Sequence, residues 1–400
     1  MARNLEDDLN EKIDRAILEE AQKPRRERMS NVALGRMFDV HETTIRRHKQ
    51  ALQKALRLPV EQDRDEFFDI PVNAITQRRR TIRLEDGSYE RVTYNPAVAV
   101  AEDVREASYE ELEKVFDRAA LAVAPKVEED RPKTLVVCLS DFQVGKTDSL
   151  GGTQETVNRV MTTLKRITEW IQAEGSYEEI IVADVGDVCE GFWNVTSQQQ
   201  TNDLSLTDQI RVAQRLMAEA VAMLAPLCTR MTYVSIPSNH CAVRTGRGND
   251  NRANSPDDDF GLLIADTIQA IMSGREPFSH VNFAKPQKWE EAVTVETADG
   301  TAVGFTHGHL AGSQAKIPSW FRDLAFGHRS GLHEASILVH GHFHNFGVSL
   351  VGDNKFIIGC PTADNGSSWF TNRTGDATDP ALLTFEVQDK KAKRWELWYE

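Results

Sequence analysis

Short apolar runs alternate with segments of helical periodicity from residue 134 onward. Each apolar run ends in polar residues: TLVVCLSD, EEIIVADVGD, MTYVSIPSNH, TAVGFTHGH and ASILVHGHFH. Segments 153–172, 207–225 and 259–272, which lie between them, have the pattern of helices. Alternation of strands with helices predicts an α/β fold with buried sheets over residues 134–400.

The first 60 residues show a helical pattern instead. Leu5, Leu9, Ile13 and Ile17 recur at four-residue spacing, which predicts an amphipathic helix. Ser30 is a suitable N-cap for NVALGRMF, and the short turn DVHE separates that segment from TTIRRHKQALQKAL. Two short helices joined by a tight turn are typical of a helix-turn-helix. We therefore expect a small all-α domain of this kind over residues 1–60.

Residues 61–133 are interpreted as a connector between these two regions. RRRTIRLEDGSYERVTYN predicts a β-hairpin around Asp86 and Gly87, either a wing on the helical module or a small domain of its own. Residues 99–123 predict a helix. Residues 123–133 are charged, carry two prolines and predict a linker.

The charge of the helical module favours nucleic acid as its partner. Residues 24–57 carry nine Lys or Arg and three acidic residues, in a chain whose net charge is −14. A basic patch within an acidic chain is typical of a phosphate-binding surface. The residues expected to face DNA from the second helix are Thr43, Thr44, Arg46, Arg47 and Lys49. Helix-turn-helix shapes also mediate protein contacts, so a protein partner remains an alternative.

The cysteines and the apolar runs of the sequence indicate the cellular compartment in which we expect the protein. The five cysteines are scattered and never form a CxxC pair, which argues against a disulfide framework or a thiolate zinc site. The apolar runs are shorter than a membrane span, and MARNLEDDLNEK lacks the apolar core of a secretory signal. We expect a cytoplasmic protein (in the host cytoplasm if it is viral) with no membrane partner. A homodimer is compatible with these observations.

Metal-competent side chains follow all five predicted strands. They are Asp141, Gln143, Asp187, Asn239, His307, His342 and His344. In open α/β sheets, ligands gather beyond the carboxyl ends of the strands. A mixture of Asp, Asn and His suits divalent ions such as Mn²⁺, Fe²⁺ or Zn²⁺. Seven ligands are too many for one ion, and they suit two ions that share a bridging carboxylate.

The five motifs, SDFQVG, GDVCEG, SNH, THGH and GHFH, resemble in their order the calcineurin-like metallophosphoesterases, whose pattern is DxH, GDxxD, GNH, an HG pair and GHxH. The resemblance covers about residues 134–365 and implies a two-sheet α/β/β/α sandwich. It implies a first ion held by Asp141, Gln143, Asp187 and His344. It implies a second ion held by Asp187, Asn239, His307 and His342, with Asp187 as the bridge. His240 would stabilise the phosphoryl group or protonate the leaving oxygen.

The chain departs from the family pattern at three positions. Gln143 stands where the family has His, Ser238 replaces the Gly of GNH, and Glu190 replaces the second Asp of GDxxD. An amide oxygen is a weaker ligand than imidazole for a borderline ion, so the first ion is expected to be loosely held or to be Mn²⁺. The other two replaced positions are not ligands in the family.

The resemblance and the helical module together predict a metal-dependent DNA phosphodiesterase, an exonuclease or endonuclease similar to the DNA-repair nuclease branch. Asp187 and His240 would be catalytic, with two divalent ions activating water. Mn²⁺ is expected first, with Mg²⁺, Fe²⁺ or Zn²⁺ as alternatives. One rival hypothesis is a phosphatase, or a small-molecule or cyclic-nucleotide phosphodiesterase, whose helical domain binds a protein. Another is a non-enzymatic DNA-binding regulator.

Overall fold

The computed structural model describes residues 2–21, 23, 29–56, 78–83, 89–94, 109–119, 134–175, 177–194, 198–245, 252–253, 255–327, 331–352, 355–368, 371–372, 375 and 377–400. The chain divides into two compact units, Met1–Val72 and Asn73–Glu400. The predicted linker over 123–133 lies outside the described residues.

The smaller unit consists of three helices, α1 (Ala2–Ala21), α2 (Asn31–Met37) and α3 (Glu42–Leu56). Its buried core comprises Ile13, Ile17, Leu34 and Ile45. The Ser30 hydroxyl accepts a hydrogen bond from the Ala33 amide at 3.1 Å, which confirms the predicted N-cap of α2. A Cβ atom on Gly35 would lie 2.7 Å from the Val40 carbonyl oxygen, so α2 can approach the following turn this closely only with glycine. The DNA-binding interpretation of these helices remains a prediction.

The predicted hairpin is confirmed. Strands β1 (Arg78–Arg83) and β2 (Tyr89–Tyr94) pair antiparallel, with Arg83 opposite Tyr89, and the turn at 84–88 lies outside the described residues. Helix α5 (Tyr109–Ala119), which we expected within the connector, buries Leu112, Val115 and Phe116 in the core of the larger unit. Arg275, beyond α9, also pairs with Asp117 of α5 at 2.5 Å. The larger unit therefore includes a helix from before residue 134.

A six-stranded sheet forms one layer of the larger unit. Its order is β15 (Lys391–Tyr399), β14 (Ala381–Gln388), β3 (Thr134–Leu139), β4 (Tyr177–Asp184), β5 (Cys228–Ser235) and β8 (Val281–Ala284). Strands β3, β4, β5 and β8 are parallel, and β14 runs antiparallel to both β3 and β15. The sheet is therefore mixed, with its parallel part in sequence order.

A five-stranded sheet forms the next layer. Its order is β12 (Gly347–Val351), β13 (Lys355–Gly359), β11 (Ile337–His340), β10 (Ala302–Thr306) and β9 (Ala292–Glu296). The three central strands are parallel and the two outer strands antiparallel. The two sheets share one apolar cluster, in which Val136 and Ile181 of the first sheet pack with Phe305 and Val339 of the second.

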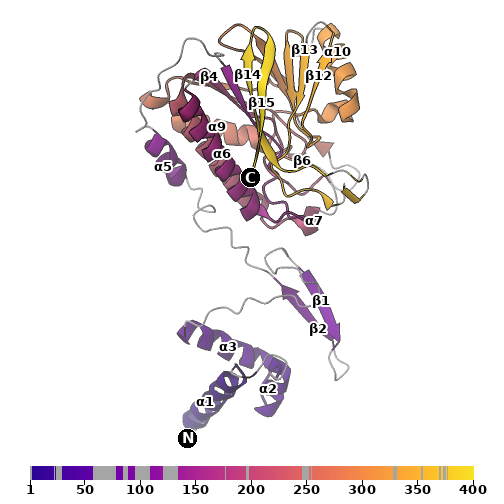
Figure 1. Ribbon diagram of the computed structural model, residues 1–400. Coiled ribbons are helices and arrows are strands. Elements are labelled where there is room, and N and C mark those ends of the chain that lie inside the picture. The colour runs from indigo at the N-terminus through magenta and orange to yellow at the C-terminus, as the bar shows by residue number, and fades with distance from the viewer. Residues whose placement is uncertain are drawn as a thin grey trace. The chain divides into compact units, whose positions relative to one another are not determined.

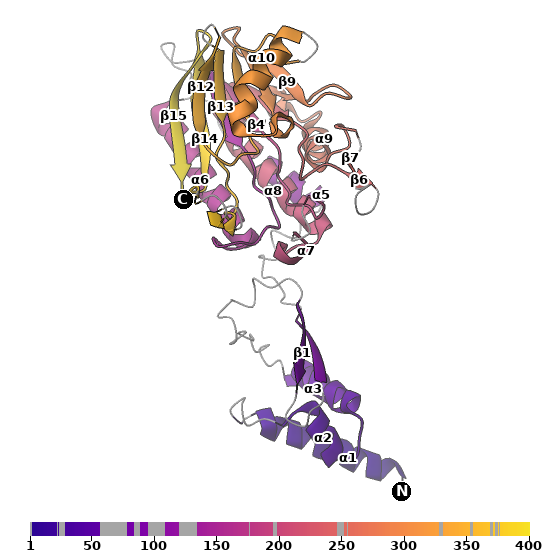
Figure 2. The same cartoon turned by 90° about the vertical axis from the view of Figure 1, so that its right-hand side faces the viewer.

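Helices cover the outer faces of both sheets (Figure 1 and Figure 2). On the six-stranded sheet lie α5, α6 (Thr153–Glu174), α8 (Leu206–Leu224) and α9 (Phe260–Met272), and on the five-stranded sheet lies α10 (Ile317–Gly327). The smaller elements are α7 (Gln198–Thr201), β6 (Arg244–Thr245), β7 (Arg252–Ala253), and the 3₁₀ helices Ala225–Leu227, Glu276–Phe278, His309–Ala311 and Gln314–Lys316. The predicted α/β/β/α layering is therefore present, and the helices predicted over 153–172, 207–225 and 259–272 are confirmed.

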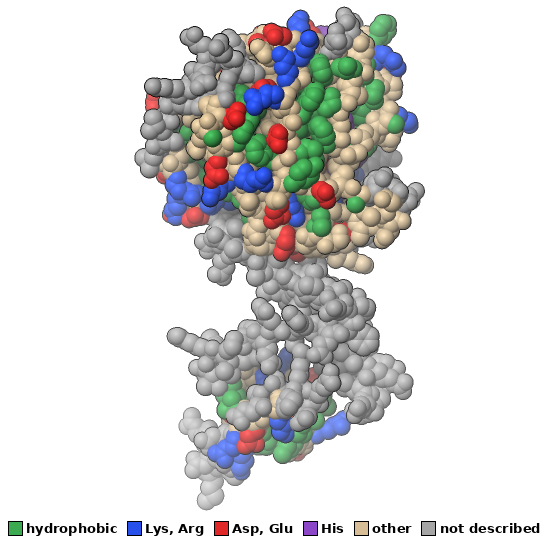
Figure 3. Space-filling view, viewed as in Figure 1, with side chains coloured by type: hydrophobic (Ala, Val, Ile, Leu, Met, Phe, Trp, Pro, Cys, Tyr) green, Lys and Arg blue, Asp and Glu red, His purple; other side chains and the backbone are tan. Residues whose placement is uncertain are grey.

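Within the described ranges, no helix combines the length and the apolar character that crossing a bilayer requires. Acidic and basic side chains are interspersed on the face of the larger unit that Figure 3 shows. The cytoplasmic location and the homodimer remain predictions.

Candidate metal centre

The metal-competent motifs follow strands that are neighbours in the two sheets. The five strands predicted to precede them are confirmed as β3, β4 and β5 in one sheet and β10 and β11 in the other. Five of the candidate residues have left-handed backbone conformations: Asp141 (φ 53°), Gln143 (φ 43°), Asp187 (φ 52°), His342 (φ 71°) and His344 (φ 55°). Non-glycine residues rarely adopt this conformation, and it concentrates at functional sites where the surroundings enforce it. Here, for example, the Gln143 amide donates to the Asp187 carbonyl at 2.8 Å.

Glycines allow the motif loops to lie against one another. A Cβ atom on Gly341 would lie 2.5 Å from Ser140 Oγ and 2.6 Å from Asp141 Oδ2. One on Gly186 would lie 2.7 Å from His307 Nδ1. The glycines of the GD and GH pairs are therefore needed for close contact between loops from different strands.

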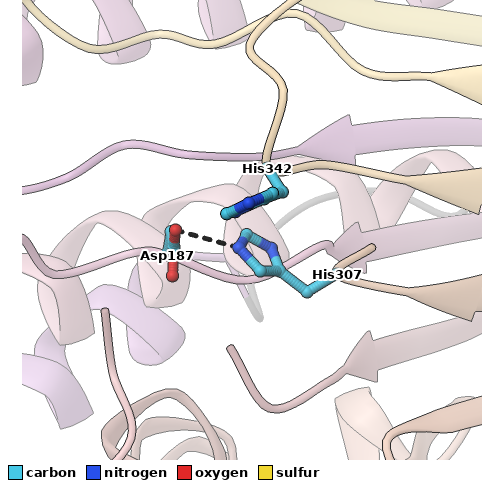
Figure 4. A group of neighbouring side chains, drawn as sticks. All are labelled: Asp187, His307 and His342. Carbon is cyan, nitrogen blue, oxygen red and sulfur yellow. Dashed lines mark ion pairs between the residues drawn. The ribbon is translucent and has the colours of Figure 1, made fainter. Parts of the chain in front are cut away.

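Asp187, Asn239, His307 and His342 converge, and we call these four residues the Asp187 cluster. His307 Nε2 lies 2.9 Å from Asp187 Oδ2 and 3.0 Å from Asn239 Oδ1. One ligand atom from each of Asp187, His307 and His342 lies within 4.8 Å of the others, and Figure 4 shows the three side chains facing one another. His307 Nδ1 donates to the Val185 carbonyl at 2.8 Å, so Nε2 is the nitrogen that faces the cluster.

The Asp187 cluster fits a divalent ion. Asp187 Oδ2 is buried and, although His307 is near, has no well-directed hydrogen bond from a described residue. Burial and the charge of His307 lower the pKa of His342 to about 4, so His342 is neutral near pH 7 and could bind an ion directly. Burial opposes a charged His307, but the carboxylates of Asp187 and Asp141 outweigh it and raise its pKa to about 9. A proton on His307 thus lies between the oxygens that would bind an ion.

The residues expected around a first ion are engaged differently. The Lys146 ammonium donates to Gln143 Oε1 at 2.6 Å and pairs with the buried Asp364 carboxylate. His344 lies between two carboxylates, with Nε2 3.2 Å from Asp141 Oδ1 and Nδ1 3.4 Å from Asp364 Oδ2. Burial opposes the charged form of His344, but Asp141 and Asp364 raise its pKa to about 10. Asp141, Gln143 and His344 therefore already have charged partners.

Sequence reasoning missed Lys146 and Asp364. Neither residue belongs to a metal motif, and 217 residues separate them in the chain. One signal was present in the sequence. Gln143 stands where the family has a histidine, and Lys146 follows it by three residues. A basic residue in the same loop as a lost ligand could have been considered a replacement for the metal's charge.

His240 lies beside the Asp187 cluster. Its amide donates to Asp187 Oδ1 at 2.8 Å, and its Nε2 lies 4.0 Å from Asp187 Oδ2. Nδ1 lies 2.7 Å from the Glu190 carbonyl oxygen and 3.2 Å from Glu190 Oε2. Burial opposes a charged imidazole, but Asp187 and Glu190 outweigh it and raise the pKa of His240. Glu190, for which no role was predicted, therefore orients His240 and favours its protonated form.

The candidate DNA-binding residues of α3 differ in exposure. Thr43, Arg46 and Arg47 are exposed, whereas Thr44 and Lys49 are half-buried. The Lys49 ammonium donates to Asn31 Oδ1 at 2.6 Å, which ties α3 to the start of α2. Among the five candidates, the two arginines are thus the best placed cations for a phosphate.

Comparisons with known proteins give little support to a function. No protein-family model matches the chain, and no curated protein matches it. The solved structures that match include Vps29 of Chaetomium thermophilum, with 10% identity over 67% of this chain and 96% of that chain and a TM-score of 0.29. A similarity this weak does not indicate a function for this chain.

Proposed function

We propose that this chain is a metal-dependent phosphodiesterase that acts on DNA. The observation that carries the proposal is the convergence of Asp187, Asn239, His307 and His342 from four strand ends. A divalent ion bound there would polarise a phosphoryl oxygen and lower the pKa of water.

His240 would act on the phosphate from the side of the cluster. Its side chain is 16% exposed, whereas that of Asp187 is 1% exposed, so a substrate can reach His240 more readily than the carboxylate behind it. Nδ1 is held by Glu190, and the Nε2–H of the protonated ring can therefore donate to a phosphoryl oxygen or to the leaving oxygen. Asp187 would hold the ion and also fix the backbone of His240.

The smaller unit would supply affinity for DNA. Arg46 and Arg47 are exposed on α3, in a segment (residues 24–57) where nine basic residues outnumber three acidic residues. Neutralising backbone phosphates gives sequence-independent affinity for duplex DNA. Binding of DNA by the smaller unit would then bring a phosphodiester bond to the metal centre.

A substrate panel tests this function. Purified protein would be incubated with linear duplex, closed circular duplex, single-stranded DNA, a bis-nitrophenyl phosphate diester and a nitrophenyl phosphate monoester, each with Mn²⁺ or Mg²⁺. We expect cleavage of DNA and of the diester, faster with Mn²⁺ because imidazole favours the softer ion. Cleavage of the closed circle separates an endonuclease from an exonuclease.

His307→Ala, which removes a cluster ligand, is the control for a contaminating nuclease. Hydrolysis of the monoester alone would favour a phosphatase with a protein-binding helical unit. No hydrolysis with either ion would contradict the proposal and favour a non-enzymatic DNA-binding protein.

A further inference from the structure

We propose that the ammonium of Lys146 takes the place of the first divalent ion, so that the chain binds one ion, at the Asp187 cluster. This inference rests on the proposed function, since it concerns how many ions serve the same site. It replaces the expectation of two ions that the motif order implied.

The Lys146 ammonium lies against the side chain of Gln143. Lys146 Nζ donates to Gln143 Oε1 at 2.6 Å, and this oxygen is the atom that would coordinate an ion in place of the missing imidazole. The Gln143 amide nitrogen lies 3.4 Å from His240 Nε2, so the other end of the same group faces the candidate acid. Gln143 therefore lies between Lys146 and His240, and its oxygen already accepts a hydrogen bond from the ammonium.

The charges beside Gln143 disfavour an ion there. The Lys146 side chain is 12% exposed and the Asp364 carboxylate with which it pairs is fully buried. The ring nitrogens of His344 face the carboxylates of Asp364 and Asp141. A divalent ion beside Gln143 would lie close to the ammonium, and two cations repel strongly where little water screens them. The Asp364 carboxylate thus already has a cationic partner from the chain itself, Lys146.

Hydrogen bonds hold the loops of the ammonium and of its partner Asp364 in place. The Arg159 guanidinium of α6 donates to the carbonyl oxygens of Ala363 (3.0 Å) and Asp364 (3.1 Å). The Asn365 side chain donates to the Lys146 carbonyl oxygen at 2.8 Å. The loop of Asp364 is therefore bonded to the loop of Lys146, and moving the ammonium aside would leave a buried carboxylate without its counterion.

A lysine in this place offers the site a fixed positive charge. An ammonium is a compact cation with three donors, and it can neutralise charge on a phosphoryl oxygen as an ion does. Unlike an ion, it cannot generate a nucleophile from water. The Asp187 cluster alone would then perform that part of the chemistry.

The stoichiometry of the wild-type protein tests this directly. Metal-free protein would be titrated with Mn²⁺ by calorimetry, and the bound ion would be counted by elemental analysis after desalting. We expect one ion per chain and an electron paramagnetic resonance spectrum of an isolated Mn²⁺. Two ions with an exchange-coupled spectrum would overturn the inference and leave the proposed function standing. No bound ion would overturn both.

Two variants test the role of Lys146 itself. Lys146→Met removes the ammonium, and its combination with Gln143→His also restores the imidazole. We expect the stoichiometry of these variants to rise from one ion to two. Lys285→Met removes another lysine that pairs with an aspartate, Asp266, and should keep one ion. Folded variants, as judged by circular dichroism, that still bind one ion would overturn the inference. If the variants do not fold, the wild-type count decides.

Discussion

His307 Nε2 lies 2.9 Å from Asp187 Oδ2, and both side chains are buried. This contact places a proton where the Asp187 cluster would hold an ion, because the neighbouring carboxylates raise the pKa of His307 to about 9 against the effect of burial. Metal binding needs the neutral imidazole, so proton and ion compete for one position.

Metal binding should therefore release about one proton per ion below pH 9, and the apparent affinity should rise about tenfold per pH unit between pH 7 and 8. Calorimetry in buffers of different ionisation enthalpy would count the protons. An affinity that does not change over this pH range would contradict the displacement of a proton from His307 by the ion.

His240→Ala should retain the ion but lower the turnover of a phosphodiester by about 10²–10⁴-fold, as expected for loss of a general acid. Nε2 of His240 is 4.0 Å from Asp187 Oδ2, beside the cluster but not within it. Metal content and kcat would be measured on the same preparation. Loss of the ion from this variant would mean that His240 is a ligand.

Glu190→Gln provides a matched test of the orientation of His240. The amide keeps the size of the side chain and removes the charge that lies 3.2 Å from His240 Nδ1. Because Glu190 helps to raise the pKa of His240, the alkaline limb of the kcat profile should move to lower pH. An unchanged limb would contradict the assignment of that limb to His240.

The sequence predicted the strand ends well because each motif couples an apolar run with polar residues directly after it. Asp187 and His307 follow β4 and β10 as expected, and burial of the strands on both faces explains their continuous apolar character. Contacts between distant segments were not predictable in this way. Lys146 and Asp364 meet only because two loops converge, and no local pattern marks Asp364.

The tertiary contacts of α5 and α3 were likewise not predictable from the sequence. The amphipathic pattern of α5 predicts a helix, but not that Phe116 packs in the core of the larger unit. The spacing of α3 placed Lys49 on the side expected to face DNA, but not its hydrogen bond to Asn31. Periodicity gives the face of a helix, whereas the partner of each side chain depends on the tertiary structure.

Asp184→Asn should change how stability depends on pH. Burial raises the pKa of Asp184 to about 6, whereas an unfolded aspartate titrates near about 3.9. Between these two pKa values the folded chain binds more protons at Asp184 than the unfolded chain does. Asp184 therefore makes the free energy of unfolding fall as pH rises, by about 3 kcal/mol in total.

The slope of the free energy of unfolding against pH should therefore be more positive in the variant than in the wild type between about pH 4 and 6, as measured by urea denaturation. Its amide can still accept from Gly186 and donate to Ser235, the two partners of Asp184. Asp323→Asn, on the exposed face of α10, is the control. Equal slopes for the Asp184 variant and the wild type would contradict the raised pKa.

Arg46→Ala with Arg47→Ala should weaken binding to duplex DNA without changing the turnover of a small diester. Each lost phosphate contact should reduce the slope of log K against log salt by about 0.9. Arg118→Ala, which removes an exposed arginine from α5, is the control, since its partner is Glu219. Unchanged DNA binding and salt dependence in the double variant would favour a protein partner for the smaller unit.

The position of the ion tests the central claim most directly. Crystals grown with Mn²⁺ and measured at the manganese absorption edge would locate every bound ion in an anomalous difference map. We predict one peak, among the ligand atoms of Asp187, Asn239, His307 and His342, and its loss in Asp187→Ala crystals. A map with no peak among these four residues would contradict the account.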